Sequence, residues 1–453
     1  KVFAPGDMGW PFLGNMWSFL RAFKSGHPDD FISSFASRFG PTHVYKAFMF
    51  GSPCAILTSS ESCRRALTDD DQFGPGWPVS VTSLLGKKGL HGVSRRQHKR
   101  LRRLVAAAIS GDTALAVYLD YIKQIVATSL EKWAGWNRPM EFLTEMRKLA
   151  FRVIMYIVMS RESDPIMEVL EREYTILSQG IKATAIDLPG FAYHRALKAR
   201  EKMVRIFQGV VDERRAIKES KRERVKKDML DLLLEAEDED GGKLKDEEVI
   251  DLIIIFLTAG HESSAHAIMW AVIFLTDHPH CLHKAKEEQE EIIRRRSSTG
   301  VGLSFKEIKQ MKYLSKAIDE TLRLANISFA LFREAKTDIN LNGYIIPKGW
   351  KVLAWIRSVH MDPQNYNNPR EFDPSRWDDH IPRAGTYIPF GAGNRLCPGL
   401  DLAKLEISVF LHYFLLHYKL ERLNPGCRIR HIPIIRPVDN CLARIKKLSS
   451  STN

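Results

Sequence analysis

One cysteine lies in a loop whose composition prepares it to bind a metal. Cys397 belongs to the segment Phe390–Gly399, FGAGNRLCPG, which has glycines at positions 391, 393 and 399. Glycine lets the backbone turn tightly and approach a flat cofactor where a Cβ atom would block it. The amide groups of such a turn, together with the nearby Arg395, favour a deprotonated sulfur. Because a cysteine thiolate is a ligand of haem iron, the loop predicts an iron site with Cys397 as the metal ligand.

A helix is predicted directly after this loop. Leu402, Leu405 and Val409 recur at helical spacing, and the dipole at the start of the helix would further stabilise the thiolate. The alternative is a buried structural cysteine behind a glycine-rich loop. A lone Gly-x-Gly pattern would favour that alternative, whereas a ten-residue match makes it minor.

The longest predicted helix begins near Asp246 and ends at about His278. Acidic residues suit its start, and its centre, residues 252–257, is apolar on every face. A helix without a polar face is expected to be buried. The helix is therefore predicted to cross the interior of the protein.

Polar groups follow inside this buried helix, in the segment Thr258–Ser264, TAGHESS. A carboxylate, Glu262, lies beside the hydroxyl of Ser263, and such a pair can relay protons through ordered water in a dry pocket. The alternative is that Gly260 and Ser263 only kink the helix, with the serine bonded back to a carbonyl group. Beside the cysteine loop, proton delivery is the stronger interpretation.

The elements that position these residues are mostly amphipathic helices, with short strand signals. The helices are expected at Asp120–Trp133, Met140–Met159, Ile166–Ser178 and Ala196–Arg215. The strands are expected at Thr42–Phe50, Cys54–Thr58, Ile339–Ile346 and Lys351–Ile356. The predicted fold class is mainly α with small β sheets.

The composition suits a large globular protein. The chain has 453 residues, of which 44% are hydrophobic and 27% are charged, and it shows no linker, repeat or low-complexity tract. The one candidate break, Lys218–Glu248, is dense in charges of both signs and is interpreted as a solvated connection between helices. The six cysteines form no Cys-x-x-Cys pair, so a reducing compartment without disulfides is expected.

The net charge of +13 fits nucleic acid, an anionic membrane surface or an acidic protein partner. Because no nucleic-acid-binding motif is recognisable, nucleic acid is the weakest of these partners. The sequence has no run of eighteen apolar residues, so no membrane-spanning segment is predicted.

The cysteine loop resembles the haem-binding signature of the cytochromes P450 at every position that the signature specifies. The segment 258–264 resembles the oxygen-activation motif of the family, with Ser263 where most members carry threonine. The resemblance implies the cytochrome P450 fold, with haem b between the long central helix and the helix after the cysteine loop. It also implies a monooxygenase that uses molecular oxygen, with Glu262 and Ser263 as the catalytic residues that deliver protons.

The resemblance implies a structural triad. Glu320 and Arg323 lie three residues apart on one helical face, a spacing that by itself indicates a surface ion pair. The segment Phe372–Trp377 resembles the family segment whose arginine, here Arg376, joins that pair in a buried triad bracing the cysteine loop.

Haem propionates need cations, and the resemblance assigns several residues to the cofactor. His98 stands where the family more often has tryptophan, and it lies one helical turn before Arg102. The neighbouring Lys99, Arg100 and Arg103 are interpreted as a solvated or membrane-facing surface. The full set of expected cofactor-binding residues is His98, Arg102, Arg333, Phe390, Arg395 and Cys397.

The candidate substrate walls are mostly apolar, which suits a bulky hydrophobic substrate such as a terpenoid. The expected wall residues are Trp77, Ala259, Ile327, Phe329, Ala330 and Leu331. The apolar connection Leu188–Tyr193 either dips into a bilayer or packs against a neighbouring loop, and the two interpretations are equally favoured.

Over nearly the whole chain, the sequence resembles one plant branch of the family, the ent-kaurenoic acid oxidases of gibberellin synthesis. The segments that carry this resemblance are 6–11, 188–191, 259–264 and 439–443. It implies successive oxidations of a diterpene acid to a gibberellin precursor. A triterpenoid oxidase of the same branch is the alternative, and a non-catalytic haem-binding protein is the alternative from another class.

The chain is expected to form a single catalytic domain, 1–453. Residues 1–15 resemble the proline- and glycine-rich hinge that follows an N-terminal membrane anchor, and that anchor is expected to be missing from this chain. The resemblance implies a catalytic domain that faces the cytosol at the endoplasmic reticulum membrane. Since no dinucleotide- or flavin-binding segment is present, electrons are expected from NADPH through a membrane-bound cytochrome P450 reductase. Basic surface near the thiolate side of the haem would steer the acidic docking face of that reductase.

Overall fold

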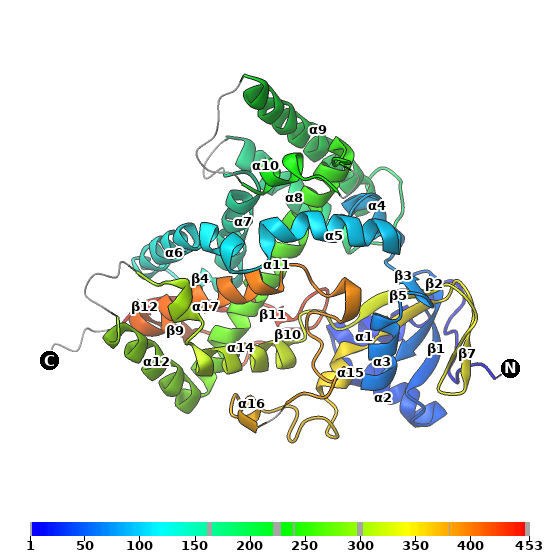
Figure 1. Ribbon diagram of the computed structural model, residues 1–453. Helices are drawn as coiled ribbons and strands as arrows, with labels where there is room; N and C mark the ends of the chain where they lie inside the picture. Colours follow the sequence, from blue (N-terminus) through cyan, green and yellow to red (C-terminus); the bar gives the residue numbers. More distant parts are fainter. Residues whose placement is uncertain are drawn as a thin grey trace. The chain divides into compact units, whose positions relative to one another are not determined.

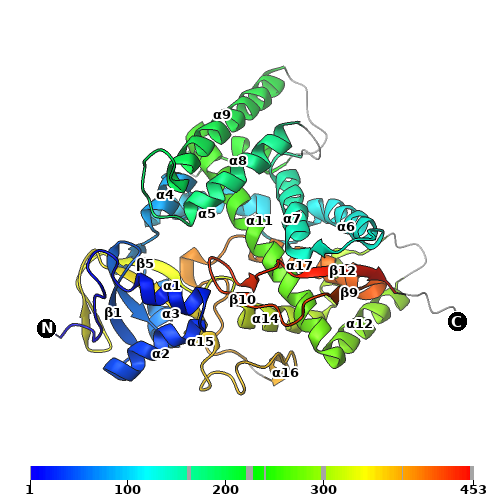
Figure 2. The same cartoon turned by 180° about the vertical axis from the view of Figure 1, so that it is seen from behind.

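The computed structural model describes residues 2–160, 165–220, 228–238, 241–296, 302–379 and 381–448. The protein is mainly helical with small β sheets, which confirms the predicted fold class (Figures 1 and 2). It divides into two compact units. The first comprises residues 1–73, 115–149 and 263–453, and the second comprises residues 74–114 and 150–262.

The first unit contains the main β sheet, with the strand order β1-β2-β8-β5-β3. β1 pairs antiparallel with β2, β2 pairs parallel with β8, and β8 pairs antiparallel with β5. These strands are β1 (Val44–Met49), β2 (Ser52–Leu57), β3 (Phe73–Pro75), β5 (Leu331–Ala335) and β8 (Lys351–Ala354).

Successive residues of this sheet face two different helical layers. Ala55 and Leu57 of β2 pack in a cluster with residues of α3, whereas Cys54 and Ile56 pack with residues of α1 and α2. This is the two-residue alternation of side chains along a strand. The three helices are α1 (Met16–Lys24), α2 (Pro28–Phe39) and α3 (Ser60–Thr68), drawn in blue in Figure 1.

The rest of the first unit is built around α17 (Leu400–His417), which is buried along most of its length. It contacts α12 (Pro279–Arg294) and α14 (Lys312–Ala325). The remaining short helices are α13 (Phe305–Ile308), α15 (Ile356–His360), α16 (Arg376–Asp379) and the 3₁₀ turn η1 (Gly393–Arg395). The remaining strands are β4 (Met140–Glu141), β6 (Ile339–Leu341), β7 (Tyr344–Ile346), β9 (Tyr418–Arg422), β10 (Ile429–Arg430), β11 (Arg436–Pro437) and β12 (Leu442–Lys447).

The second unit is helical, and its α8 and α9 pack closely against each other. A Cβ atom on Gly180 of α8 would lie 2.1 Å from the Cβ atom of Ala196 in α9, so only glycine permits this approach. The helices of this unit are α4 (Val79–Leu85), α5 (Arg95–Ile109), α8 (Pro165–Ile181), α9 (Ala192–Glu219) and α10 (Met229–Glu235).

Three helices carry residues of both units. They are α6 (Asp112–Ala134), α7 (Phe142–Met159) and α11 (Asp246–Asp277). The predicted long helix is confirmed, since α11 has 32 residues and is therefore about 48 Å long. By length and composition α11 could cross a membrane, but 67% of its most apolar window is buried inside the protein, as in the core helix of a globular domain.

The four predicted amphipathic helices are confirmed within α6, α7, α8 and α9, except that Met140 and Glu141 form strand β4. The strand expected at Ile339–Ile346 is instead a hairpin of β6 and β7. Asn342 and Gly343, at φ values of 50° and 83°, form its turn. The local pair Asn-Gly is a strong signal for this kind of turn.

The solvated connection expected at Lys218–Glu248 is wrong for the residues that the structure describes there. Helix α10 buries Met229, Leu230 and Leu233, and the buried Arg214 lies 2.9 Å from Asp228 at its N-cap. Apolar residues between the charges therefore reach the core. Residues 221–227 and 239–240 of this connection lie outside the described residues.

Candidate active site

Cys397 lies in a tight turn directly before α17. Its backbone N–H donates a hydrogen bond of 2.9 Å to the carbonyl oxygen of Phe390, which closes the loop. Gly393 has a φ of 69°, and a Cβ atom there would lie 2.8 Å from the carbonyl oxygen of Leu67. The turn thus depends on glycine. Because α17 begins at Leu400, the cysteine is at the entrance of a helix, as predicted.

A buried carboxylate, Asp70, joins two cationic residues of the site. Its Oδ1 atom lies 2.6 Å from Nη2 of Arg333, which also donates to the carbonyl oxygen of Phe73 at 2.8 Å. Asn394 of the cysteine loop donates to Oδ2 of Asp70 at 2.9 Å, and Nε of Arg395 lies 4.0 Å from Oδ1. No pattern in the sequence singled out Asp70, which is 263 positions away from Arg333.

Electrostatics keep Asp70 ionised. Burial would raise the pKa of Asp70, but hydrogen bonds from Arg333 and Asn394 and the charges of Arg333 and Arg395 outweigh it and hold the pKa below its usual value. Burial and the charge of Arg333 lower the pKa of Arg395, which Asp70 partly offsets. One carboxylate thus serves two guanidinium groups, so this side of the cysteine loop carries excess positive charge.

These residues fit a haem. Nε of Arg333 is buried and has no hydrogen-bond partner among the described residues, so a donor is available to a carboxylate. The glycines of the loop allow a flat group to approach the backbone beside Cys397. Sγ of Cys397 would bind the iron, and Arg333 and Arg395 would hold a propionate.

The two other expected propionate partners are on α5 in the second unit. His98 is buried and Arg102 is half-buried, one helical turn further along. The expectation of a solvated surface for their neighbours is wrong for Arg100. Its guanidinium forms ion pairs with Asp238 at 2.7 Å and with Glu248 at 3.1 Å, so Arg100 joins α5 to the start of α11.

Lys99 and Arg103, the other two members of the basic run, are exposed. A surface position for these two is thus consistent with the structure. The basic residues of this run therefore differ in role. Arg100 forms ion pairs within the second unit, whereas Lys99 and Arg103 expose their charges on the surface.

The predicted proton-delivery residues are consecutive in α11. In the second unit, Oε2 of Glu262 forms an ion pair with Nζ of Lys182 at 3.1 Å, and Oγ of Ser178 donates to Oε1 at 3.5 Å. Ser263 follows and is half-buried. Ser178 of α8 and Lys182, the residue directly after α8, therefore fix the orientation of the Glu262 carboxylate.

A second acid, absent from the predicted site, lies on α17. The buried carboxyl of Glu406 is hydrogen-bonded to the hydroxyl of Ser264, the residue after Ser263. Burial raises the pKa of Glu406 to about 8, and the hydrogen bond from Ser264 offsets only part of this effect. Glu406 therefore holds a proton at neutral pH. The sequence contains a signal for this acid, since Glu406 lies between the apolar residues Leu405 and Ile407 in the buried part of α17.

The expected triad residues meet in the interior rather than at the surface. Both carboxylate oxygens of Glu320 accept hydrogen bonds from Arg323, at 2.7 and 2.9 Å. Nε of Arg376 donates to Oε1 of Glu320 at 3.3 Å, and the indole of Trp377 donates to Oε2 at 3.1 Å. Glu320 and Arg323 have no exposed side-chain surface, so their geometry is held by the core.

Hydrogen bonds connect this triad to the backbone just before the cysteine loop. Arg323 donates to the carbonyl oxygen of His360 at 2.8 Å, and the His360 ring accepts from the N–H of Ile388 at 3.0 Å. The other ring nitrogen of His360 lies 2.9 Å from Oδ1 of Asn326. Burial and the charge of Arg323 lower the pKa of His360 to about 3, so the ring stays neutral. Ile388 lies two residues before Phe390.

The expected substrate-wall residues fall into different surroundings. In the first unit, Leu331 lies beside the cysteine loop, because a Cβ atom on Gly391 would be 3.2 Å from its Cδ1 atom. Phe329 instead packs on Phe23, with ring centroids 5.1 Å apart, and Ala330 is buried in the same cluster with α1 and α2. These two contribute to the core beneath the sheet.

The other expected wall residues are less buried than this core. Ile327 is half-buried in the first unit. In the second unit Trp77 is half-buried, and Ala259 is exposed although Phe256 and Leu257 before it are buried. A surface-accessible alanine within a core helix is consistent with a wall position.

Comparison with known proteins identifies the family. The family model for cytochrome P450 matches residues 4–433. The chain is 56% identical to ent-kaurenoic acid oxidase 1 of Arabidopsis thaliana over 97% of this chain and 90% of that relative. It is 55% identical to the 7,8-epoxymelianol synthase of Ailanthus altissima and 51% identical to the beta-amyrin 11-oxidase of Glycyrrhiza uralensis. Each of these two matches covers 98% of this chain, with 89% and 91% of the respective relative.

A solved structure has the same fold. The retinoic acid-bound cyanobacterial CYP120A1 superposes with a TM-score of 0.87 at 27% sequence identity, covering 99% of this chain and 100% of that one. The match runs through both compact units, as does the family model. With Cys397 in a loop that fits a haem, the chain belongs to the cytochrome P450 family of haem-thiolate monooxygenases.

Proposed function

We propose that this monooxygenase is an ent-kaurenoic acid oxidase, which oxidises a diterpene acid in successive steps to a gibberellin precursor. The observation that carries the proposal is the identity of 56% to two ent-kaurenoic acid oxidases over 97% and 98% of the chain. Relatives with the same activity in barley and rice are each 54% identical. Residues 1–453 would act as one catalytic domain.

The chain's own residues would hold the cofactor in defined roles. When bound, the haem supplies the iron at which molecular oxygen is activated for insertion into a C–H bond. Cys397 would be the iron ligand, and His98, Arg102, Arg333 and Arg395 would bind the propionates. Phe390 contributes its carbonyl oxygen to the turn that holds the Cys397 amide.

The triad of Glu320, Arg323 and Arg376 would be structural. Its hydrogen bonds through His360 to Ile388 support this role, because they fix the backbone two residues before the cysteine loop begins. A rigid loop keeps the thiolate in position through repeated cycles.

Two carboxyl groups of the chain would supply protons. Glu262, held by Lys182 and Ser178, would feed the hydroxyl of Ser263. Glu406, which is protonated at neutral pH and bonded to Ser264, would act as a second proton source from α17. Positioned acids of this kind typically accelerate proton-transfer steps by about 10²- to 10⁴-fold.

Electrons would come from NADPH through a cytochrome P450 reductase. The excess of positive charge, +13 for the whole chain, supports an encounter with an acidic partner, because complementary potentials speed association. The proposed partner is a membrane-bound flavoprotein, in keeping with a membrane-associated oxidase.

The proposed location is the endoplasmic reticulum membrane, with the catalytic domain facing the cytosol. In the first unit, aromatic side chains near the N-terminus are exposed, with Trp10 at 72%, Phe12 at 100% and Trp17 at 65% of their maximum. In the second unit, Leu188 and Phe191 are also exposed, at 56% and 46%. Such side chains suit contact with a lipid surface.

A triterpenoid oxidase is the second candidate function. Its support is the identity of 55% to a 7,8-epoxymelianol synthase and of 51% to a beta-amyrin 11-oxidase, over almost the whole chain. The diterpene acid is the first candidate because four ent-kaurenoic acid oxidases are 54–56% identical to the chain, although the 7,8-epoxymelianol synthase is only one percentage point below the highest of them.

The test is turnover by the full-length enzyme with a plant reductase and NADPH. Ent-kaurenoic acid and beta-amyrin are supplied in parallel reactions, and the products are analysed by mass spectrometry. Sequential oxidation of ent-kaurenoic acid alone supports the proposal. Oxidation of beta-amyrin alone overturns the substrate assignment and favours the second candidate.

A further inference from the structure

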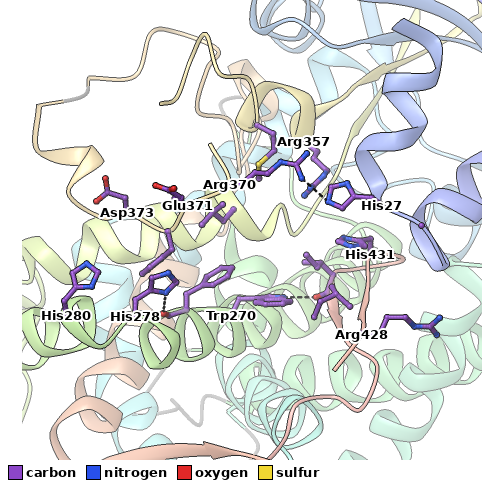
Figure 3. A pocket seen from close by; sticks show the side chains of 17 residues that line it. His27, Trp270, His278, His280, Arg357, Arg370, Glu371, Asp373, Arg428 and His431 are labelled. Carbon is purple, nitrogen blue, oxygen red and sulfur yellow. Dashed lines mark hydrogen bonds between the residues drawn. The ribbon is translucent and has the colours of Figure 1, made fainter. Parts of the chain in front are cut away.

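The open cavity of the first unit, about 950 Å³ in volume, is bounded by side chains that already have partners (Figure 3). Arg357 and Arg370 both form ion pairs with Asp29, at 2.6 and 3.0 Å. The rings of Phe274 and Phe372 stack with centroids 5.2 Å apart. These groups are satisfied by other side chains of the first unit, so they do not indicate a ligand.

A buried carboxylate in the second unit has a different set of partners. Asp251 lies on α11 and is only 1% exposed. Its Oδ1 atom lies 2.5 Å from Nη2 of Arg200 on α9, and its Oδ2 atom accepts a hydrogen bond of 3.0 Å from the backbone N–H of Lys88. Lys88 belongs to the connection between α4 and α5. Asp251 therefore fastens both this connection and α9 to the same turn of α11.

Two glycines let the connection lie directly on α11. A Cβ atom on Gly86 would be 2.0 Å from Oδ1 of Asp251, and one on Gly89 would be 1.9 Å from Cδ1 of Ile255. Gly86 also has a φ of 95°, which residues with a side chain rarely adopt. Both glycines are buried. Residues 86–89, which we call the glycine loop, are thus packed against the helix without intervening side chains.

The glycine loop covers part of one face of α11. Asp251, Ile255 and Ala259 recur every four residues, so they share that face. Asp251 is buried and Ile255 is half-buried beneath the loop, whereas Ala259 is exposed. The cover therefore ends between Ile255 and Ala259. If Ala259 is a wall of the substrate space, as the sequence predicts, the glycine loop closes that space on one side.

We propose that Asp251 is a positioning residue, which holds the glycine loop as an end wall of the substrate space and thereby limits the size of the ligand. This role rests on the proposed function, because the substrate must lie over Ala259, but it does not depend on which terpenoid is oxidised. Loss of the carboxylate would leave the N–H of Lys88 without its acceptor and Arg200 without its counterion. The loop would then move away from α11.

Limited proteolysis tests whether Asp251 holds the loop. Lys87 and Lys88 are exposed trypsin sites within the glycine loop, and cleavage of a native protein follows the population of the opened segment. We expect Asp251→Ala to raise the rate of cleavage at these two sites about tenfold, the effect of losing one hydrogen bond to a charged group. Gly86→Ala should do the same, because it displaces the loop while retaining every charge. Cleavage elsewhere in the chain should be unchanged.

Two matched controls separate the loop from the rest of the second unit. Asp246→Ala also breaks an ion pair between α11 and α9, but the partners of Asp246, Gln208 and Arg215, both lie on α9. Gly111→Ala places a side chain at a φ of 84° with no atom beyond its chain neighbours within 4 Å, so it reproduces the backbone strain without displacing a neighbour. Both controls should leave cleavage in the glycine loop unchanged.

Ligand size tests whether the loop is a wall. Soret spectra of the haem-loaded protein give the dissociation constants of two azoles that ligate iron, the bulky clotrimazole and the small 1-phenylimidazole. In Asp251→Ala and Gly86→Ala we expect clotrimazole to bind about tenfold more tightly, because apparent affinity rises with the population of the binding-competent state. The affinity for 1-phenylimidazole should be unchanged. A purely structural role would change both constants alike or neither.

The azoles are not the natural substrate, so a failed turnover assay with ent-kaurenoic acid would leave this test intact. Unchanged cleavage at Lys87 and Lys88 in both variants would overturn the proposal that Asp251 holds the loop. Faster cleavage with an unchanged affinity for clotrimazole, or with equal gains for the two azoles, would show that the loop does not bound the substrate space. Equally fast cleavage in Asp246→Ala would assign the effect to the contact between α9 and α11 instead.

Discussion

Asp70 Oδ1 lies 2.6 Å from Nη2 of Arg333, and both side chains are buried. The pair joins the loop after α3 to strand β5, and Asn394 of the cysteine loop donates a hydrogen bond to the same carboxylate. Arg333 is thus tied through Asp70 to the cysteine loop, and its Nε atom has no hydrogen-bond acceptor among the described residues. If Arg333 holds a haem propionate as proposed, the pair links the stability of the first unit to cofactor retention.

Replacement of Asp70 by asparagine should therefore be costly. Breaking a buried ion pair leaves an uncompensated charge, so we expect Asp70→Asn to lower the free energy of unfolding by about 3–5 kcal/mol. Urea denaturation measures this change. The control is Glu61→Gln, an exposed carboxylate on α3; an equally small effect of both variants would show that the pair contributes nothing.

The same pair should make the stability of the protein depend on pH. Because the pKa of Asp70 is lowered from 3.8 in the folded protein, its contribution to stability is full above pH 3.8 and is lost as the pH falls through the lowered value. The stability difference between the parent protein and Asp70→Asn should thus shrink below pH 3.8. A difference that grows on acidification would contradict this.

The contribution of Glu406 to stability should change with pH in the opposite direction. Its pKa is raised from 4.5 to about 8 in the folded protein, so between these two values the folded state holds a proton that the unfolded state has lost. Stability conferred at this site must then fall as the pH rises from 4.5 to about 8. Glutamine mimics the protonated form.

We therefore expect the melting temperature of the parent protein, relative to Glu406→Gln, to decrease from pH 5 toward pH 8 and to level off above it, within about one pH unit of these limits. Thermal unfolding followed by circular dichroism measures the difference. A difference independent of pH would show that Glu406 is ionised in the folded protein.

Serine at position 263 provides a hydroxyl without the methyl group of threonine. Ser263→Ala should reduce product formed per NADPH consumed by about 100-fold, the lower end of what a positioned proton donor contributes, whereas Ser263→Thr should retain it. Thr276→Val removes another hydroxyl of α11, bonded to Val272, and serves as the control. If Ser263→Ala remained fully coupled, proton delivery through Ser263 would be refuted.

The triad should tolerate no change of charge. Glu320→Gln leaves Arg323 and Arg376 without a carboxylate in the interior, so we expect a loss of about 3–5 kcal/mol in the free energy of unfolding and protein purified with less haem. Lys316→Gln, on the same helix, breaks an exposed ion pair with Asp378 and should cost under about 1 kcal/mol. Equal losses in the two variants would argue against a buried brace.

The parts of the site that were predictable are local in sequence. The cysteine loop and the segment 258–264 are contiguous, so their residue types and spacing suffice to indicate a thiolate and an acid beside a hydroxyl. The extent of α11 was predictable for the same reason, because acids mark its start and a long apolar run marks its buried centre.

Features that depend on distant contacts could not be predicted. Nothing near Asp70 indicates that it meets Arg333, and nothing near Ser264 indicates that it meets Glu406. The sequence does not indicate helix α10, because charged neighbours surround its three buried apolar residues. The sequence predicts Phe329 as a pocket wall, whereas it packs against Phe23, because apolar character alone does not distinguish a cavity lining from a core position.

The most direct test of the account concerns Cys397 as the iron ligand. Resonance Raman spectroscopy of the ferric protein, prepared with either ³²S- or ³⁴S-cysteine, detects an iron–sulfur stretch that shifts with the isotope. We predict this band in the parent protein and in Cys427→Ser, and its loss in Cys397→Ser. A band that persists in Cys397→Ser, or that is absent from the parent protein, would contradict the assignment of Cys397 and with it the haem-thiolate site.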